Sequence, residues 1–359
     1  MGNRRSRPRL TEPELRARID ASLAAVDDYI ELAEVLKRAS RFQEAADIYE
    51  RGLQAAHLTK LERASLACEL GAVTEMASLG PRSRSAALAE QALAYLPDEP
   101  ESCDVVLIRG LSYSVLAHAV WFSDRAAGEE AAHAGIRWLE QAVRDCRADV
   151  ENTAAYYELA RLHNALKEPL VAAEYCERYL RSDLDKPSRL AALTVLAEAQ
   201  ESAGQLDDAE RTVHEALRWA GDDNRARPLL YQTLGLIALA REQWPKARDA
   251  FDEALHALLS IEPRDPDPEM VRHLYWALVQ VHFKMGNRRD AIAALKQLLI
   301  YYDDDVSGRR RAYLWLGDCH ADLSMRSEAR RYYDEVLKSP RASDEERAAA
   351  RDGLAALGA

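Results

Sequence analysis

A small side chain returns eight times along this chain in the same sequence surroundings. The positions are Ala33, Gly71, Ala117, Ala160, Ala197, Gly235, Val279 and Gly317. The interval is roughly 37 to 46 residues, which is typical of stacked helical hairpins. One hairpin cannot bury its apolar side alone and needs its neighbours to complete the core. The sequence therefore predicts an all-α array in which most residues serve as scaffold.

The clearest copy of the repeat lies near the C-terminus. The residues that define the pattern form two groups. The first is Tyr313, Leu316 and His320, and the second is Ala329, Tyr333 and Val336. Spacings of three and four residues place each group on one side of a helix, and the short turn around Ser324 makes the two helices antiparallel. Comparable pairs begin near Tyr29, Leu70, Tyr113, Tyr156, Leu193, Tyr231 and Tyr275, and the copies at Leu70 and Tyr113 depart most from the pattern.

This arrangement resembles the tetratricopeptide repeat, in which an aromatic residue, a Leu-Gly pair, a Tyr, an Ala with a Phe, and a Pro recur. The resemblance covers residues 26–341. It implies a right-handed superhelical solenoid of about eight helix-turn-helix repeats with capping helices. It also implies a non-enzymatic adaptor or scaffold that binds a peptide or a partner protein in its concave groove.

Both ends of the chain differ from the repeats. Residues 1–10 form a basic, flexible tail, and Thr11 is a candidate N-cap for a helix within residues 11–25. Ser343 and Glu346 have the spacing of a capping box and open a final helix within residues 342–359. Because no long linker interrupts residues 26–341, we expect one elongated domain closed by these terminal helices.

Composition excludes several classes of protein. The net charge of −12 and the pI near 5.4 disfavour binding to nucleic acid, which is itself an anion. The five cysteines are far apart and odd in number, which favours reduced thiols, mostly in the core. No apolar stretch approaches the roughly 18 residues of a membrane span, and no signal peptide is evident. We therefore expect a soluble, cytoplasmic protein for which membrane binding is disfavoured.

Two surface features each have a simpler explanation than a specific site. Residues 1–6 match the pattern for myristoylation at Gly2, but the pattern is short and a basic tail accounts for it. Acidic groups around Asp222, Asp265 and Asp303 lie in expected loops between repeats. The last group copies only the first half of a calcium-binding loop, so a solvated acidic edge is the better interpretation.

Neither a metal site nor a catalytic site is indicated. His163, His282 and His320 recur at the repeat position where the related family carries Tyr, one in each copy, which favours packing over metal coordination. The chain has no nucleophile elbow, phosphate-binding glycine loop or zinc-protease motif. We therefore expect no enzyme activity, no metal and no cofactor.

The resemblance places a groove on the first helix of each repeat. Transferred by register, its positions are Ile30, Glu34, Lys37, Tyr157, Arg161, Asn164, Thr194, Glu198, Glu201, Gln232, Leu236, Leu239, Trp276, Gln280, Phe283, Leu314 and Asp318. The candidate partner-binding residues among them are Tyr157, Arg161, Asn164, Gln232, Trp276, Gln280 and Phe283, because aromatic residues and arginine dominate binding interfaces. Trp276 has a second interpretation, in which it packs against the neighbouring repeat.

Family members that hold chaperone C-termini use a Lys and Asn set to clamp carboxylates, and this chain lacks that set. Arg161 with Asn164 resembles half of it. Two further functions stay open at this point. One is a regulator whose superhelix changes pitch when it captures a signalling peptide, and the other is a structural protein that assembles end to end into homo-oligomers.

Overall fold

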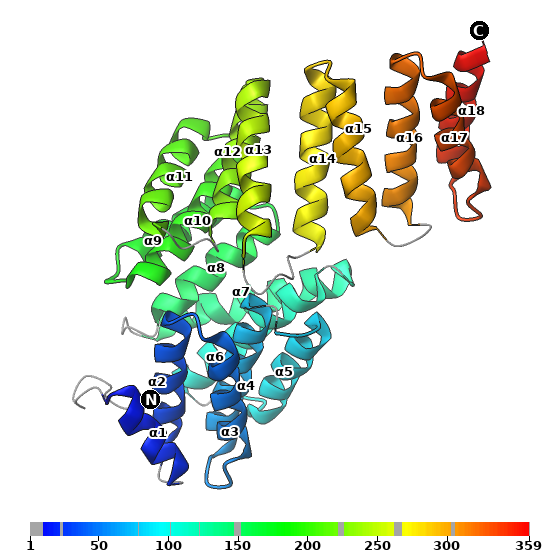
Figure 1. Cartoon of the computed structure of the whole chain (residues 1–359). Coiled ribbons are helices and arrows are strands. Elements are labelled where there is room, and N and C mark those ends of the chain that lie inside the picture. The colour runs from blue at the N-terminus through cyan, green and yellow to red at the C-terminus, as the bar shows by residue number, and fades with distance from the viewer. Residues whose placement is uncertain are drawn as a thin grey trace. The chain divides into compact units, whose positions relative to one another are not determined.

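The computed structural model describes residues 10–21, 24–77, 79–100, 102–121, 123–146, 152–221, 226–261, 268–302 and 306–358. These residues form α-helices joined by short turns, with one short 3-10 helix and no strand among them (Figure 1). The chain is an all-α solenoid of helical hairpins, as the sequence predicts. Contacts divide it into two compact units, residues 1–202 and 203–359, where the sequence suggests one continuous array.

Unit 1 contains ten helices within its described residues. They are α1 (Glu12–Asp20), α2 (Val26–Arg38), α3 (Phe42–Gln54), α4 (Lys60–Met76), α5 (Arg82–Tyr95), α6 (Cys103–Val120), α7 (Arg125–Asp145), α8 (Asn152–Ala165), α9 (Pro169–Leu180) and α10 (Lys186–Ser202). The hairpins α2/α3, α4/α5, α6/α7 and α8/α9 correspond to the first four repeats, and α10 opens the fifth.

Unit 2 begins with the second helix of the fifth repeat. Its described elements are α11 (Leu206–Ala220), α12 (Arg227–Ala240), α13 (Trp244–Leu259), α14 (Pro268–Lys284), α15 (Arg288–Leu298), η2 (Leu299–Tyr301), α16 (Ser307–Asp322), α17 (Arg326–Lys338) and α18 (Asp344–Gly358). The hairpins α12/α13, α14/α15 and α16/α17 are repeats six to eight. Seven of the eight predicted repeats therefore form a hairpin within one unit, and the fifth has one helix in each.

Close packing within a hairpin explains the recurring small residue. A Cβ atom at Gly317 on α16 would lie 2.4 Å from the ring of Tyr333 on α17, and one at Gly235 would lie 2.4 Å from the ring of Phe251. Carbon atoms need about 3.5 Å of separation, so neither position accepts a larger residue without movement. Gly353 on α18 touches the same Tyr333 ring, where its Cβ would also lie 2.4 Å away. The last hairpin and its capping helix thus enclose one aromatic ring.

The turn inside a hairpin has a repeated conformation. In six of the repeats the second residue after the first helix has a positive φ, between 56° and 78°. These residues are Ser40, Lys167, Gly204, Glu242, Gly286 and Ser324. This left-handed residue ends a helix and reverses the chain. The turn of the second repeat instead has a positive φ of 135° at Gly80, four residues after α4, and this repeat is one of the two copies whose sequences depart most from the pattern.

Both terminal helices begin as predicted. The backbone nitrogen of Thr11 donates to Glu14 at 2.7 Å at the start of α1. The backbone nitrogen of Ser343 donates to Glu346 at 2.8 Å, and that of Glu346 donates to the Ser343 hydroxyl at 3.1 Å. Reciprocal bonds of this kind satisfy backbone groups that a helix leaves unpaired at its first turn. The capping box predicted at Ser343 and Glu346 is confirmed.

The expectation of reduced cysteines is wrong for one pair. Cys103 at the start of α6 and Cys146 directly after α7 form a disulfide across 43 residues of sequence. An antiparallel hairpin brings the start of one helix beside the end of the other, so the two Cα atoms lie 5.7 Å apart. Cys68, Cys176 and Cys319 are free and buried as expected, and burial raises the pKa of their thiols.

The expectation that no apolar stretch approaches the length of a membrane span is also wrong. Helix α6 has 18 residues with a mean hydropathy of 1.4, so by length and composition it is apolar enough to cross a membrane. In the fold, 56% of it is buried. Helices α4, α5, α7 and α8 pack around it. A core helix of a hairpin array meets the same criteria because it is apolar on several sides. No other helix in the described ranges does so.

Candidate functional site

Arg161 on α8 links helices of unit 1 that are far apart in the sequence. Its guanidinium lies 3.2 Å from Glu158, one turn earlier on α8, and 3.4 Å from Glu75 on α4. The hydroxyl of Ser114 on α6 donates to the same Glu158 at 2.6 Å. Burial alone would lower the pKa of Arg161, but Glu158 and Glu75 raise it overall. One polar network therefore joins α4, α6 and α8.

A second ion pair lies farther along unit 1. Arg38, the last residue of α2, is 3.1 Å from Asp185, which directly precedes α10. The two side chains are 51% and 39% exposed, so the pair contributes at most about 1 kcal/mol to stability. Its position is more informative than its energy, because it brings the first repeat against the start of the fifth.

Both links join repeats that are not neighbours, and both run through the first helices of their hairpins. The first helices therefore lie on the inner side of the curve that unit 1 follows. We call this side the inner face of unit 1. It comprises Glu34, Lys37, Glu69, Glu75, Glu158, Arg161, Asn164, Glu198 and Glu201.

Lys37 lies at one end of the inner face. Its ammonium contacts Glu34 on the same helix and is 3.3 Å from Glu69 on α4, which also accepts a hydrogen bond of 3.4 Å from Tyr49. Burial would lower the pKa of Lys37, but Glu69, Tyr49 and Glu34 outweigh it and raise the pKa well above its usual range. Lys37 is thus held in its charged form by two carboxylates.

Glu198 on α10 lies near the other end of the inner face. Its partner is the amide of Asn164, which donates to it at 3.2 Å. Burial raises the pKa of Glu198 to about 7, against the opposing effect of Arg161. Nearby, the half-buried Tyr157 packs against Tyr179 with ring centroids 5.4 Å apart. The predicted residues Tyr157, Arg161 and Asn164 therefore belong to one face.

In unit 2 the first helices carry an aromatic group. The ring of Trp315 on α16 lies 5.9 Å from Trp276 and 5.2 Å from Phe283, both on α14, and meets each edge-on. The indole nitrogen of Trp276 donates to the hydroxyl of Tyr302 at 2.8 Å. The guanidinium of Arg311 lies 4.8 Å above the Trp276 ring. Trp276, Phe283 and Trp315 are half-buried, so each packs against the adjacent repeat and also keeps an exposed edge.

Residues 276–346, which contain this aromatic group, match the model of the tetratricopeptide repeat family. These residues of unit 2 are assigned to the tetratricopeptide repeat family. No curated protein matches the sequence. Solved structures support the fold at low sequence identity.

Two solved structures share this all-α fold over most of the chain. A monomeric mutant of IFIT1, solved with Gppp-AAAA, is 16% identical, covers 96% of this chain and 77% of its own, and has a TM-score of 0.56. The apo form of RapI is 10% identical, covers 93% of this chain and 98% of its own, and has a TM-score of 0.52. A tetratricopeptide repeat protein of Thermus thermophilus is 21% identical over 60% of this chain and 99% of its own, at a TM-score of 0.41.

The predicted partner-binding residues fall on both units of the tetratricopeptide array. Tyr157, Arg161 and Asn164 lie in unit 1, and Gln232, Trp276, Gln280 and Phe283 lie in unit 2. Gln232 on α12 is half-buried and Gln280 on α14 is exposed. The seven predicted residues therefore define two candidate faces, each built from the first helices of its own unit.

Sequence reasoning missed several residues of these faces. Glu158 is three residues before Arg161 on the same helix, so its helical spacing was an available signal. Glu75 gave no signal, because its distance to Arg161 depends on how far the tetratricopeptide array curves. Trp315 and Arg311 were missed because the register identifies groove positions and not the side chains that pack between adjacent first helices.

Two of the three recurring histidines, His163 and His320, pack as predicted. His163 stacks on Tyr175 with centroids 5.5 Å apart and ring planes at 14°, and His320 stacks on Tyr332 at 5.4 Å and 17°. The same contact in the fourth and eighth repeats indicates a shared structural role. Within the described ranges, no group of three potential ligands is placed to hold a metal ion. The acidic loop residues 222–223, 265, 267 and 303–305, and Gly2, lie outside the described residues.

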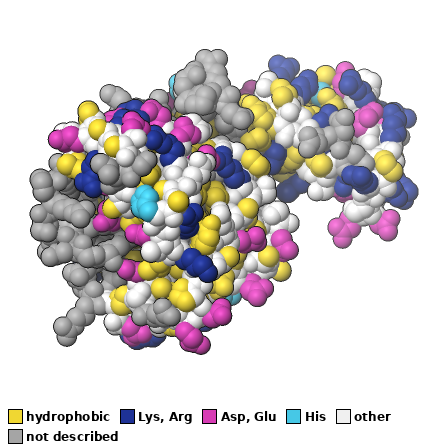
Figure 2. Space-filling view, turned by 90° about the horizontal axis from the view of Figure 1, so that it is seen from below, with side chains coloured by type: hydrophobic (Ala, Val, Ile, Leu, Met, Phe, Trp, Pro, Cys, Tyr) yellow, Lys and Arg dark blue, Asp and Glu magenta, His cyan; other side chains and the backbone are white. Residues whose placement is uncertain are grey.

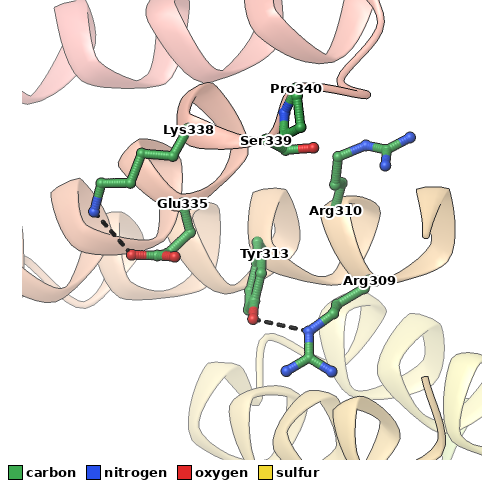
Figure 3. Close-up of a pocket in the computed structure, with 7 residues that line it drawn as sticks. All are labelled: Arg309, Arg310, Tyr313, Glu335, Lys338, Ser339 and Pro340. Carbon is green, nitrogen blue, oxygen red and sulfur yellow. Dashed lines mark hydrogen bonds and ion pairs between the residues drawn. The ribbon is translucent and has the colours of Figure 1, made fainter. Parts of the chain in front are cut away.

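A shallow pocket of about 270 Å³ lies between α16 and the end of α17 (Figure 3). Its basic residues are already engaged. Arg309 donates to the Tyr313 hydroxyl at 3.0 Å, and Lys338 pairs with Glu335 at 3.0 Å. Arg310 pairs with Glu346 of the capping helix at 2.8 Å. The pocket sits at the carbonyl end of α17, which disfavours anions, so its charges stabilise the last repeat.

Proposed function

We propose that this protein is a non-enzymatic scaffold that binds a peptide or a partner helix on the first-helix faces of its repeats. Tetratricopeptide repeats are protein-interaction modules, and this broader role follows from the family. The finer proposal rests chiefly on one observation. The aromatic group of unit 2, formed by Trp276, Phe283 and Trp315, is half-exposed although the hairpins that surround it are complete.

Large aromatic side chains with an exposed edge and a nearby arginine have the composition of binding hot spots. Arg311 above Trp276 adds a cation at the same place. Elsewhere, Figure 2 shows basic and acidic side chains largely interspersed over the coloured surface in view. The aromatic group is therefore the better anchor in unit 2.

The test uses an exposed position so that the fold is not disturbed. Gln280→Arg places a large charged side chain on the aromatic face of α14, and Gln297→Arg makes the same change on the exposed side of α15. Peptides selected from a random display library against the wild-type protein should lose at least tenfold in affinity for Gln280→Arg. They should bind Gln297→Arg unchanged. Equal binding to all three proteins would exclude this face as the binding site.

A further inference from the structure

Arg311 places a positive charge beside the aromatic group of unit 2. It lies near the start of α16, its side chain is exposed, and its guanidinium is 4.8 Å from the centre of the Trp276 ring on α14. Among the described residues, neither a carboxylate nor a backbone carbonyl contacts this guanidinium. Arginine stays charged throughout the physiological pH range. A full positive charge without an anionic partner among these residues therefore lies beside the aromatic group.

Most other arginines that lie over an aromatic ring also have a second partner. Arg288 is 3.6 Å from the centre of the Phe283 ring and pairs with Asp322. The stacked arginines of unit 1 with carboxylate partners are Arg125 with Glu129, Arg161 with Glu158 and Glu75, and Arg178 with Glu174. Those that donate to backbone carbonyls are Arg109, Arg272 and Arg309. Arg331 lies over Tyr332, the next residue of its own helix. Arg311 thus differs from these arginines, because it reaches a ring on another helix without an oxygen partner in the described chain.

The contact with Trp276 also holds Arg311 in place. The indole nitrogen of Trp276 donates to the hydroxyl of Tyr302 at 2.8 Å, and the ring meets Trp315 edge-on. A ring fixed on two sides gives the guanidinium a defined position above it. An arginine that is already ordered loses less side-chain entropy when it pairs with a carboxylate, which it can do through two parallel N–H bonds. Arg311 is therefore arranged to receive an anionic group.

Trp315 supplies the apolar half of the same site. It follows Arg311 by four residues on α16, contacts both Trp276 and Phe283, and keeps part of its ring exposed. Residues four apart on a helix have Cβ atoms about 6 Å apart. A partner that meets both side chains needs a carboxylate and an apolar group at a similar separation. In an extended segment, residues two positions apart are about 7 Å from each other and point to the same side, so they satisfy this condition.

Asp318 determines which end of the site takes the carboxylate. It lies three residues beyond Trp315 on α16 and accepts a hydrogen bond of 2.7 Å from the Tyr333 hydroxyl. A second carboxylate beside it would be repelled. The acidic residue of a partner is therefore favoured at Arg311, and the apolar residue over the rings of Trp315 and Phe283.

We propose that the partner of the aromatic group is a peptide segment in which Asp or Glu lies two positions from a large apolar residue. The carboxylate pairs with Arg311, and the apolar side chain covers the exposed edges of Trp315 and Phe283. The inference rests on the proposed function, because it names the chemistry of the segment bound at that face. Since the carboxylate belongs to a side chain, the segment can be internal to a partner protein.

The first experiment selects peptides from a random display library in parallel against three full-length chains, wild type, Arg311→Gln and Arg289→Gln. Arg289 is an exposed residue of the second helix α15, so its replacement makes the same change of charge away from the aromatic group. Wild type and Arg289→Gln should both enrich Asp or Glu two positions from an apolar residue, and Arg311→Gln should not. The chain has a net charge of −12, so general attraction would enrich basic peptides instead. Equal enrichment in all three selections, or none with wild type, would overturn the proposal.

The second experiment measures the contact directly by fluorescence anisotropy. A peptide selected on wild type is compared with a copy whose acidic residue is replaced by the matching amide. Wild type should favour the acidic peptide by about fivefold or more, which is the size of a good exposed ion pair. Arg311→Gln should reduce this preference to less than about twofold, and Arg289→Gln should preserve it. If Arg311 served only to hold Trp276, its replacement would weaken both peptides equally, and that result would contradict the assigned contact. Circular dichroism spectra establish that each variant remains folded.

Failure of this inference and failure of the proposed function give different results. Gln280→Arg places a side chain over the rings, whereas Arg311→Gln leaves the rings exposed and removes the charge. Peptides that respond to Gln280→Arg but show no preference for an acidic residue would keep the binding face and overturn the assigned partner chemistry. Selected peptides that do not respond to Gln280→Arg would overturn both.

Discussion

Replacing Gly317 with alanine tests the packing that defines the repeat. The new Cβ atom would lie 2.4 Å from the ring of Tyr333, so the ring must retreat by about 1 Å to reach ordinary contact distance. Gly353 lies against the same ring with an equally short potential contact, which leaves little room to move. Movement would also disturb the hydrogen bond of 2.7 Å that the Tyr333 hydroxyl donates to Asp318.

The expected change in stability follows from two destabilising contributions and one stabilising contribution. Overpacking of a core typically costs about 1–3 kcal/mol, and the weakened hydrogen bond adds about 1 kcal/mol. Alanine in place of glycine within a helix returns about 1 kcal/mol. We therefore expect Gly317→Ala to destabilise the last hairpin by about 2 kcal/mol, which corresponds to a roughly 30-fold increase in local opening.

Gly71→Ala is the matched control, since it changes the same register position in the second repeat. A Cβ atom there would meet its nearest neighbour, Val115, at 3.1 Å, with other atoms at 3.5 Å. The helix-propensity gain should then dominate, and stability should be unchanged or slightly higher. Hydrogen exchange resolved by peptide is the suitable assay, because it reads α16 to α18 separately from unit 1. Equal exchange in wild type and Gly317→Ala would refute the packing argument.

Three further changes probe other features. Cys103→Ser should lower the stability of unit 1 by about 2–4 kcal/mol in denaturant unfolding, because the disulfide with Cys146 closes a long stretch of chain. A reductant should lower the stability of the wild type and leave that of the variant unchanged. Arg310→Ala should expose α18 to faster hydrogen exchange, since Glu346 is left partly buried without this partner; unchanged protection would contradict it. Burial raises the pKa of Glu198 from 4.5 to about 7, so the folded state holds a proton that the unfolded state has lost. Stability should therefore fall as pH rises from about 4.5 to 8, by up to about 3 kcal/mol, and Glu198→Gln should abolish that fall.

The repeats were predictable because their signal is local. Spacings of three and four residues identify each helix, and Ser343 with Glu346 marks the start of the last one. The contact of Arg161 with Glu75 was not predictable, because it depends on curvature accumulated over two repeats. The disulfide was missed for a related reason. It joins the two ends of the third hairpin, one of the copies whose boundaries the sequence defines least well.

The ion pair between Arg161 and Glu75 spans 86 residues of sequence. Most contacts in a hairpin array connect segments close in the chain, which keeps contact order low and allows folding to begin at any repeat. This pair is different, because the intervening hairpins must reach their final curvature before its two ends can meet. Its formation is therefore a late event in folding. It makes the completed inner surface of unit 1 a marker that all of the helices between α4 and α8 have folded.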